Sequence, residues 1–134
     1  MLAQAPTHLQ KHGVLGRVQL VPGSFFGEVP RGADAYILKT VLHNWTDENA
    51  RIILRNVRAA MEPGQRLLVA DFVGGHDALM TLIPFMDLAG MLLFSGRERT
   101  EKEMAQIFEQ TGFRFRRLIP LPACQAIFEG VAVA

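Results

Sequence analysis

The sequence predicts an α/β fold, because short apolar segments of strand character alternate with segments that repeat apolar side chains at helical spacing. Residues 67–73 form a nearly continuous apolar run of the kind that a buried parallel strand shows. Residues 46–61 place five apolar side chains on one helical face, namely Ala50, Ile53, Leu54, Val57 and Met61. Alternating strands and helices imply a mostly parallel sheet with right-handed crossovers.

The first half of the chain contains two predicted strands and two predicted helices. Residues 3–12 are expected to form a short helix that ends at Gly13, and residues 17–21 a strand closed by proline and glycine. Residues 34–38 are the next predicted strand, and Thr46 is the expected N-cap of the helix that follows it. The polar face of that helix should lie in solvent and carries Arg51, Arg55 and Arg58.

Two further helices are predicted in the second half. Residues 78–94 show a helical pattern that Pro84 is expected to kink or divide. Thr100 followed by Glu103 is a capping box, in which each residue satisfies a backbone N–H of the other. This motif predicts a helix over residues 101–110.

The last two strands are predicted over residues 113–119 and 125–129 and are expected to pair antiparallel across a proline-bearing loop. The first of them carries the main basic cluster of the sequence, Arg114, Arg116 and Arg117. We expect these arginines to form the solvent face of the strand. The net charge of +1 gives no electrostatic footprint for nucleic acid.

Composition limits the remaining classes of protein. With 134 residues, 49% hydrophobic and 20% charged, the chain has the size and balance of one globular domain. It contains no apolar run near the ~20 residues that span a bilayer, so no membrane insertion is expected. A single cysteine, Cys124, excludes an internal disulfide framework and favours a cytoplasmic setting. His8 and His12 share a helical face, but without a third ligand no metal site is expected.

His43 is the first candidate catalytic residue, because it follows the strand over residues 34–38 and stands just before a helix start. Ligands of open α/β sheets bind at the carboxyl ends of the strands, and histidine titrates near neutral pH. Asp71 ends the strand expected beside it, so its carboxylate could hold the second imidazole nitrogen. Without further context, a structural histidine that caps the helix would be the alternative.

Four sequence blocks carry a family resemblance. They are VPGSFF (21–26), ADAYILKTVLHNWTDENA (33–50), RLLVADFV (66–73) and GRERTEKEM (96–104). In this order and spacing they resemble the C-terminal part of the S-adenosylmethionine-dependent O-methyltransferases of the plant caffeate type and the bacterial polyketide and hydroxyneurosporene type. The resemblance implies that residues 1–134 form a partial class I methyltransferase sheet, Rossmann-like, with flanking helices and a C-terminal antiparallel strand pair.

The resemblance also implies roles for individual residues. His43 would deprotonate the acceptor hydroxyl, with Asp71 and Glu98 as assisting carboxylates, although the family has Glu at the position of Asp71. The implied S-adenosylmethionine-binding residues are Gly23, Ser24, Phe25 and Lys39. The implied acceptor-binding residues are Trp45, Met86 and Met91. For Trp45 and the methionines, ordinary core packing is the competing interpretation.

Two features of the family are missing from these residues. The glycine-rich turn and the acidic residue that hold the methyl donor are absent, and so is the N-terminal dimerisation and substrate-lid domain. The chain therefore resembles half of a catalytic domain. The alternatives are a non-catalytic remnant and one chain of a split enzyme. In each case we expect unpaired strand edges, and hence a homo-oligomer or a partner chain that supplies the missing half.

Overall fold

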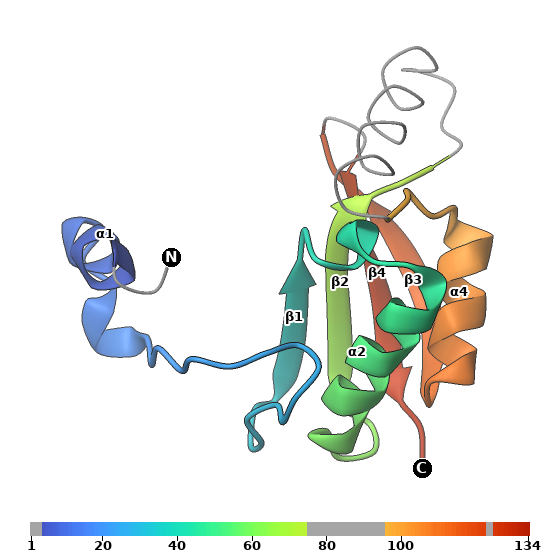
Figure 1. Ribbon diagram of the computed structural model, residues 1–134, viewed down its shortest axis with the longest axis horizontal. Coiled ribbons are helices and arrows are strands. Elements are labelled where there is room, and N and C mark those ends of the chain that lie inside the picture. The colour runs from blue at the N-terminus through green and yellow to red at the C-terminus, as the bar shows by residue number, and fades with distance from the viewer. Residues whose placement is uncertain (1–3, 75–95, 123–124) are drawn as a thin grey trace.

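The computed structural model describes residues 4–74, 96–122 and 125–134, and its centre is a four-stranded sheet (Figure 1). The strands are β1 (Ala35–Lys39), β2 (Arg66–Phe72), β3 (Phe113–Pro120) and β4 (Gln125–Ala132). In space they follow the order β1, β2, β4, β3. β1 pairs with β2 in parallel, whereas β4 pairs antiparallel with both β2 and β3. The predicted α/β class and the C-terminal antiparallel pair are confirmed.

The prediction of a mostly parallel sheet is wrong for the described strands, because only one of their three pairings is parallel. The reason is the short connection between β3 and β4. A connection of a few residues returns the chain antiparallel, since a parallel pair needs a crossover of roughly a dozen residues or more. The β3–β4 hairpin joins β2 through β4 and so adds two antiparallel pairings.

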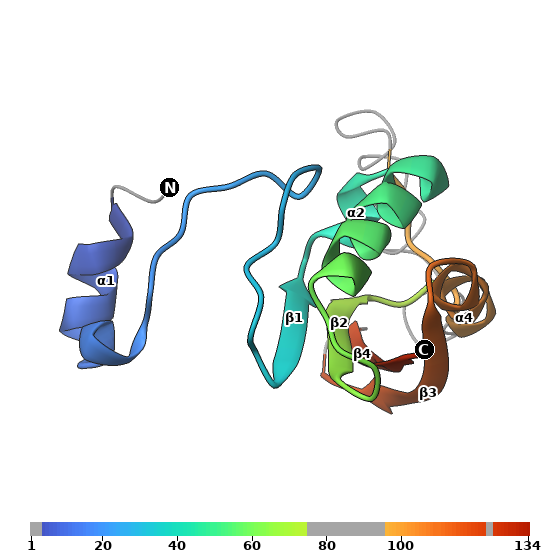
Figure 2. The same ribbon diagram turned by 90° about the horizontal axis from the view of Figure 1, so that it is seen from below.

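Two amphipathic helices, α2 (Asp47–Ala59) and α4 (Glu101–Gln110), cover one face of the sheet (Figure 1, Figure 2). The Thr46 hydroxyl caps α2 by accepting a hydrogen bond of 3.3 Å from the backbone of the first turn. The predicted capping box starts α4, with Thr100 and Glu103 each accepting a backbone N–H of the other. Both predicted helix starts are confirmed.

The core lies between these two helices and the sheet. The α2 side chains buried there are Ala50, Ile53, Leu54 and Val57, with Met61 just beyond the helix. The opposite face is less solvated than expected, because two of its arginines bind other elements. Arg51 donates to Gln110 at 2.6 Å, and Arg58 donates to the Gly112 carbonyl at 3.1 Å. These bonds tie α2 to the end of α4 and to the turn that follows it.

The predicted strand over residues 17–21 is wrong. A 3₁₀ turn (Leu15–Arg17) is followed here by chain without regular structure. A strand needs neighbours for its backbone hydrogen bonds, and none of the described strands pairs with this segment. The preceding helix α1 (Ala5–Lys11) confirms the first predicted helix, buries none of its side chains and lies apart from the sheet (Figure 1). The helix predicted over residues 78–94 lies outside the described residues.

The carboxyl ends of β1 and β2 lie side by side, because the two strands are parallel and in register up to the pair Lys39–Ala70. The Thr40 amide extends this ladder by donating to the Ala70 carbonyl at 2.9 Å. The chain that leaves β1 therefore passes next to Asp71, the following residue of β2.

Candidate active site

His43 lies on a 3₁₀ turn, Leu42–Asn44, that joins β1 to α2. The fully buried Leu42 side chain anchors the turn in the core, and the His43 amide donates to the Asp71 carboxylate at 3.1 Å. Thr40, at the entrance to the turn, has a φ of 55°. This left-handed conformation is strained for a β-branched residue, and such strain is typical of functional sites. The position of the turn thus overrides a local conformational preference.

The three residues predicted as catalytic come together around the imidazole. The Nδ1 atom of His43 lies 3.6 Å from an oxygen of Asp71 and 3.6 Å from an oxygen of Glu98. The His43 side chain is 20% exposed, whereas those of Asp71 and Glu98 are 2% and 7% exposed. The ring also stacks on Phe72, with 5.6 Å between the centroids. One edge of the imidazole therefore faces two nearly buried carboxylates while part of the ring stays open to solvent.

The two carboxylates change the acid–base behaviour of the imidazole. Glu98 is the main cause that raises the pKa of His43 above its ordinary value; burial opposes this effect, and the charge of Asp71 adds to it. Burial raises the pKa of Asp71, although the His43 charge and backbone hydrogen bonds partly offset the rise. Perturbed ionisable groups at the end of a parallel strand pair are typical of a site for proton transfer.

The sequence analysis missed two residues that shape this cluster, Gly96 and Arg99. A Cβ atom on Gly96 would stand 1.9 Å from the carbonyl oxygen of His43, so glycine is required by the close approach of the two backbones. Arg99 is fully buried and donates to the carbonyls of Leu42 and Trp45, on either side of His43. Both residues stand in the block GRERTEKEM, which was interpreted only for Glu98 and the helix cap.

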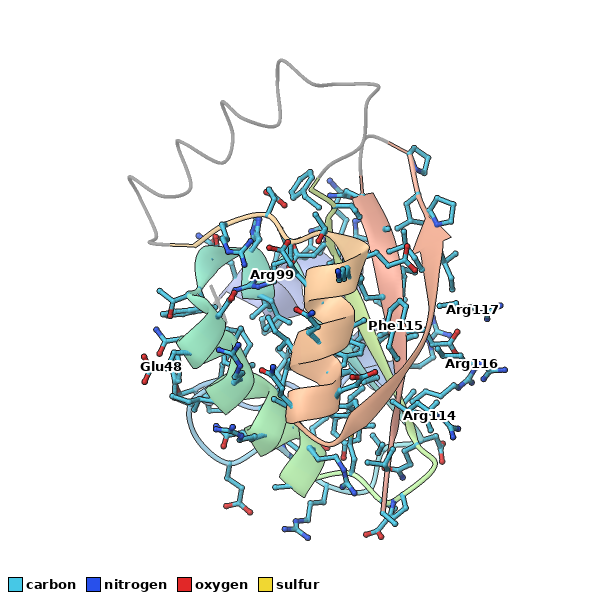
Figure 3. The ribbon with its side chains drawn as sticks, turned by 90° about the vertical axis from the view of Figure 1, so that its right-hand side faces the viewer. Glu48, Arg99, Arg114, Phe115, Arg116 and Arg117 are labelled. Carbon is cyan, nitrogen blue, oxygen red and sulfur yellow. The ribbon has the colours of Figure 1, made fainter. Side chains whose placement is uncertain are left out.

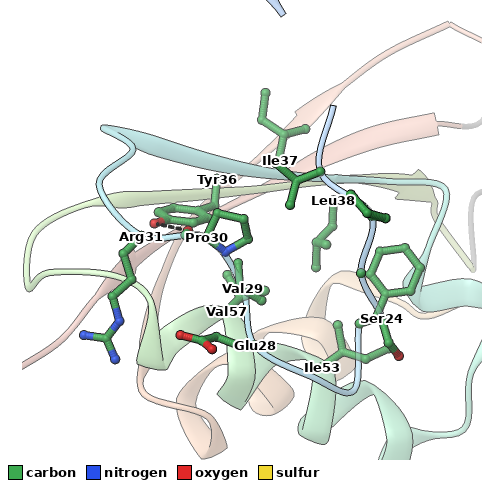
Figure 4. A pocket seen from close by; sticks show the side chains of 14 residues that line it. Ser24, Glu28, Val29, Pro30, Arg31, Tyr36, Ile37, Leu38, Ile53 and Val57 are labelled. Atoms are coloured by element: carbon green, nitrogen blue, oxygen red, sulfur yellow. Dashed lines mark hydrogen bonds between the residues drawn. The ribbon is translucent and has the colours of Figure 1, made fainter. Parts of the chain in front are cut away.

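The residues proposed to bind the methyl donor are only partly brought together. Gly23, Ser24 and Phe25 line a cavity of about 560 Å³ between the segment that precedes β1, β1 itself and α2 (Figure 4). The Asn56 side chain holds this segment on α2 by donating to the Phe25 carbonyl at 3.0 Å. Lys39 is exposed, donates to the Thr40 hydroxyl at 3.3 Å and does not line the cavity.

The residues proposed to bind the acceptor are described only at Trp45. Its half-buried ring packs against the core and meets Phe26 edge to face at 4.8 Å, so the core-anchor interpretation holds at least in part. Met86 and Met91 lie outside the described residues. The rings of His8 in α1 and His12 at its C-cap lie 4.6 Å apart, and the described part of the chain holds no group of three or more side chains that could hold a metal ion.

In the described ranges, no helix combines the length and the apolar character needed to cross a bilayer.

Comparison with known proteins places the sequence and the fold of this chain among methyltransferases. The O-methyltransferase domain family matches residues 1–114. A mitomycin biosynthesis 6-O-methyltransferase of Streptomyces lavendulae is 41% identical over 116 residues, which cover 86% of this chain and 33% of that protein. The crystal structure of LaPhzM has a TM-score of 0.90 at 33% identity and covers 98% of this chain and 40% of its own.

The crystal structure of NcsB1, an O-methyltransferase from neocarzinostatin biosynthesis, is similar with a TM-score of 0.86 at 33% identity. That structure contains S-adenosylmethionine and 2-hydroxy-5-methyl naphthoic acid; the likeness covers 98% of this chain and 38% of that one. This chain therefore spans between a third and two fifths of the length of the proteins that it matches.

Proposed function

Because the chain belongs to the O-methyltransferase family, we propose that it is the C-terminal portion of a catalytic domain that methylates a phenolic or polyketide-like hydroxyl from S-adenosylmethionine. The observation that carries this proposal is the imidazole of His43 at 3.6 Å from both Asp71 and Glu98. These residues meet at the carboxyl ends of β1 and β2, where open α/β sheets bind their ligands. The proposed acceptor is a small molecule.

His43 acts as the general base in this proposal. A phenol with a pKa near ~10 is ionised in only about one molecule in a thousand at neutral pH, so a positioned base is needed. Asp71 and Glu98 face Nδ1 and hold the imidazole proton there, which leaves Nε2 to take the hydroxyl proton. Both carboxylates also stabilise the imidazolium that forms. General-base catalysis of this kind contributes about 100- to 10,000-fold.

When bound, S-adenosylmethionine supplies a methyl group on a sulfonium. The cavity beside Ser24 fits the adenine end of such a molecule, because aliphatic and aromatic side chains such as Leu38 and Tyr36 form much of its wall (Figure 4). The charged methionine end needs charged partners, and the described lining offers only Glu28 and Arg31 among mostly apolar side chains. The described residues thus fit one end of the donor better than the other.

The remaining binding residues complete the proposal. Lys39 lies next to the turn of His43 and is assigned to the adenosine side of the donor. Trp45 links the two parts of the site, since its ring touches Phe26 of the segment that carries Gly23, Ser24 and Phe25. We assign Trp45, with Met86 and Met91, to the acceptor pocket. A cytoplasmic location is proposed from the single cysteine.

A chimera tests this function directly. The chain would replace the matching third of the mitomycin biosynthesis 6-O-methyltransferase, with which it shares 41% identity. We expect the chimera to transfer labelled methyl from S-adenosylmethionine to a catechol, a His8→Ala chimera to do the same, and a His43→Ala chimera to fail. A chimera that folds and binds S-adenosylmethionine by calorimetry, yet methylates no phenol of a broad panel, would contradict the proposal.

The 134-residue chain by itself should bind S-adenosylmethionine weakly, because the glycine-rich turn is not among its residues. Each lost ligand hydrogen bond costs about 0.5 to 1.5 kcal/mol, so the loss of several weakens binding by roughly two decades or more. Calorimetric titration checks this expectation. A dissociation constant in the low micromolar range, or methylation of a catechol without added protein, would show that this half of the domain suffices.

The exposed edge of β1 favours an arrangement in which a second chain or a further part of the same chain completes the sheet. Ile37, in the middle of β1, is 66% exposed, and β1 pairs with a described strand on one side only. The isolated chain should therefore self-associate, as a homo-oligomer, and bind a hydrophobic dye. Light scattering should show a smaller assembly for Ile37→Lys. A strictly monomeric, dye-free chain with a sharp melting transition would exclude this arrangement.

A further inference from the structure

Arg99 is an arginine that the proposed chemistry does not use, yet it is among the most buried side chains of the described residues. Its side chain is 1% exposed, and burial lowers its pKa, although the contact with Asp47 opposes this effect. A buried guanidinium is costly unless its N–H groups are bonded and its charge is matched. The arrangement around Arg99 meets both requirements and is directed at the turn of His43.

The guanidinium bonds to two carbonyls on the chain between β1 and α2 and to the first residue of α2. One terminal nitrogen donates to the Leu42 carbonyl at 2.8 Å, and the other donates to the Trp45 carbonyl at 2.7 Å. The Nε atom donates to the Asp47 carboxylate at 2.9 Å. The rigid, planar guanidinium therefore holds two backbone carbonyls, one immediately before His43 and one two residues after it.

The backbone of Arg99 is tied to the strand that carries Asp71. Its carbonyl accepts the Gly74 amide at 3.1 Å, and the residue forms a parallel bridge with Val73, next to the end of β2. The residue before it in the sequence is Glu98. Arg99 thus connects the segments that supply all three members of the imidazole cluster.

We propose that Arg99 is a positioning residue, which fixes the turn of His43 relative to β2 so that the imidazole lies between the carboxylates of Asp71 and Glu98. Calling this imidazole a catalytic base rests on the proposed function. The positioning itself does not, because it concerns the geometry of the chain alone. The competing interpretation is an ion pair with Asp47 that stabilises the fold without affecting the imidazole.

The charges that act on His43 allow the two interpretations to be separated. Asp71 faces the imidazole from β2, and Glu98 and Arg99 come from the segment before α4. The positive charge of Arg99 by itself lowers the pKa of His43, whereas the position of the carboxylates raises it. Loss of the charge and loss of the positioning would therefore have opposite effects. Arg99→Lys keeps the positive charge and removes the planar guanidinium, so it tests the effect of positioning separately from the effect of charge.

The first test is an NMR titration of the His43 imidazole in the 134-residue chain. Arg99→Lys should lower the pKa of His43 from its raised value towards ~6.5, because the turn no longer holds the ring between the carboxylates. Arg97→Lys is the matched control, since Arg97 also bonds to Asp47 and its second described bond goes to Glu103 and not to the turn. An unchanged His43 pKa in a folded Arg99→Lys chain, or the same change in both variants, would overturn the proposal.

A second variant keeps the proposal testable if Arg99→Lys does not fold. Asp47→Asn keeps the guanidinium and an acceptor oxygen but weakens the hydrogen bond to Nε, and Asp47 is not among the main groups that shift the pKa of His43. We expect a smaller change in the same direction, and an unchanged pKa in this folded variant would also overturn the proposal.

The kinetic consequence is measured in an assembly that transfers methyl groups. Arg99→Lys should lower kcat at least about tenfold with little change in KM for S-adenosylmethionine, because misplacement of a catalytic group by about 1 Å can cost 100-fold. The acid limb of the pH profile of kcat should also move to lower pH in Arg99→Lys. If methyl transfer is never observed, the proposed function fails, and the NMR result still decides whether Arg99 positions the imidazole.

Discussion

Asp71 and Glu129 are two carboxylates that are 2% exposed, lie on neighbouring strands, and have different ion-pair partners. Glu129 on β4 pairs with arginines of β3, with Arg117 at 2.6 Å and Arg116 at 3.6 Å. Figure 3 labels both arginines along β3. Asp71 has the imidazole of His43 at 3.6 Å as its ion-pair partner. The charge of Glu129 is therefore matched by permanent cations, whereas the charge of Asp71 is matched by an imidazole that titrates.

This difference sets the direction of each pKa shift. A hydrogen bond from Arg117 lowers the pKa of Glu129, whereas burial raises the pKa of Asp71. Equal side-chain exposure therefore does not produce equal pKa shifts. A guanidinium stays charged and fixes its partner as an anion, but an imidazole can release its proton and leave the carboxylate unmatched. On this basis we expect the site of Asp71 to move a proton and the ion pairs of Glu129 only to stabilise the fold.

The largest expected effect belongs to His43. In an assembly that transfers methyl groups, His43→Ala should lower turnover at least about 100-fold with little change in the affinity for S-adenosylmethionine, because a general base acts mainly in the transition state. Asp71→Ala should cost less. Single-turnover kinetics and calorimetry measure the two quantities, with the exposed His8→Ala as control. Near-normal turnover of His43→Ala from about pH 6 to 9 would remove His43 from the mechanism.

Glu98→Gln should have the next largest effect, with a characteristic pH dependence. Glu98 is the main cause of the raised pKa of His43, so its loss lowers that pKa. Because only the neutral imidazole accepts a proton, the acid limb of the turnover profile should move to lower pH. The plateau should fall by roughly tenfold, since the imidazolium loses a nearby anion. Glu101→Gln, at the exposed start of α4, is the control, and an unmoved acid limb would contradict the assignment of Glu98.

Glu129→Gln should affect stability and leave turnover unchanged. Because the folded pKa of Glu129 lies below its unfolded value of ~4.3, its ion pairs stabilise the fold above that pH and lose this effect as the pH falls through the folded value. Denaturant unfolding should show a less stable variant at pH 7 and a smaller difference in acid. A loss of turnover in the folded variant would break the comparison between the two carboxylates.

The smallest effects are expected at the arginines around Glu129. Arg117→Ala should destabilise more than Arg116→Ala, because the distance to Glu129 is 2.6 Å for Arg117 and 3.6 Å for Arg116. Both side chains are more than half exposed, so both losses of stability should be modest. They should also become smaller in 1 M salt, because the Debye length there is only about 3 Å. The exposed Arg114→Ala should show no measurable change.

Local signals in the sequence predicted the described helices well, whereas pairing between distant segments was predicted less well. The capping box at Thr100 predicted the start of α4, because a cap and the first turn of its helix are encoded within a few neighbouring residues. The expected strand over residues 17–21 was wrong, because strand character alone supplies no partner for the backbone. The solvent face predicted for Arg114, Arg116 and Arg117 is confirmed, as all three are exposed.

The residues of the candidate site that lie at strand ends could be predicted from the sequence. The residue that binds the backbone of a segment distant in the sequence could not. His43 and Asp71 follow from the rule that parallel strands bring their carboxyl ends together. Arg99 did not follow, because arginine is usually exposed and its bond to Leu42 joins residues 57 positions apart. Only the folded chain shows that an arginine beside Glu98 turns inward.

Gly96 gives the site a form of mutational fragility that has nothing to do with reactive groups. Because its Cα faces the His43 carbonyl so closely that a Cβ would stand at 1.9 Å, a single added methyl must push the turn away from β2. The imidazole would move with the turn and leave its carboxylates. A scan for inactivating substitutions should therefore find one at Gly96, a residue without a side chain. A design that transfers the cluster to another scaffold must keep the space beside the His43 carbonyl free as well as place the three functional groups.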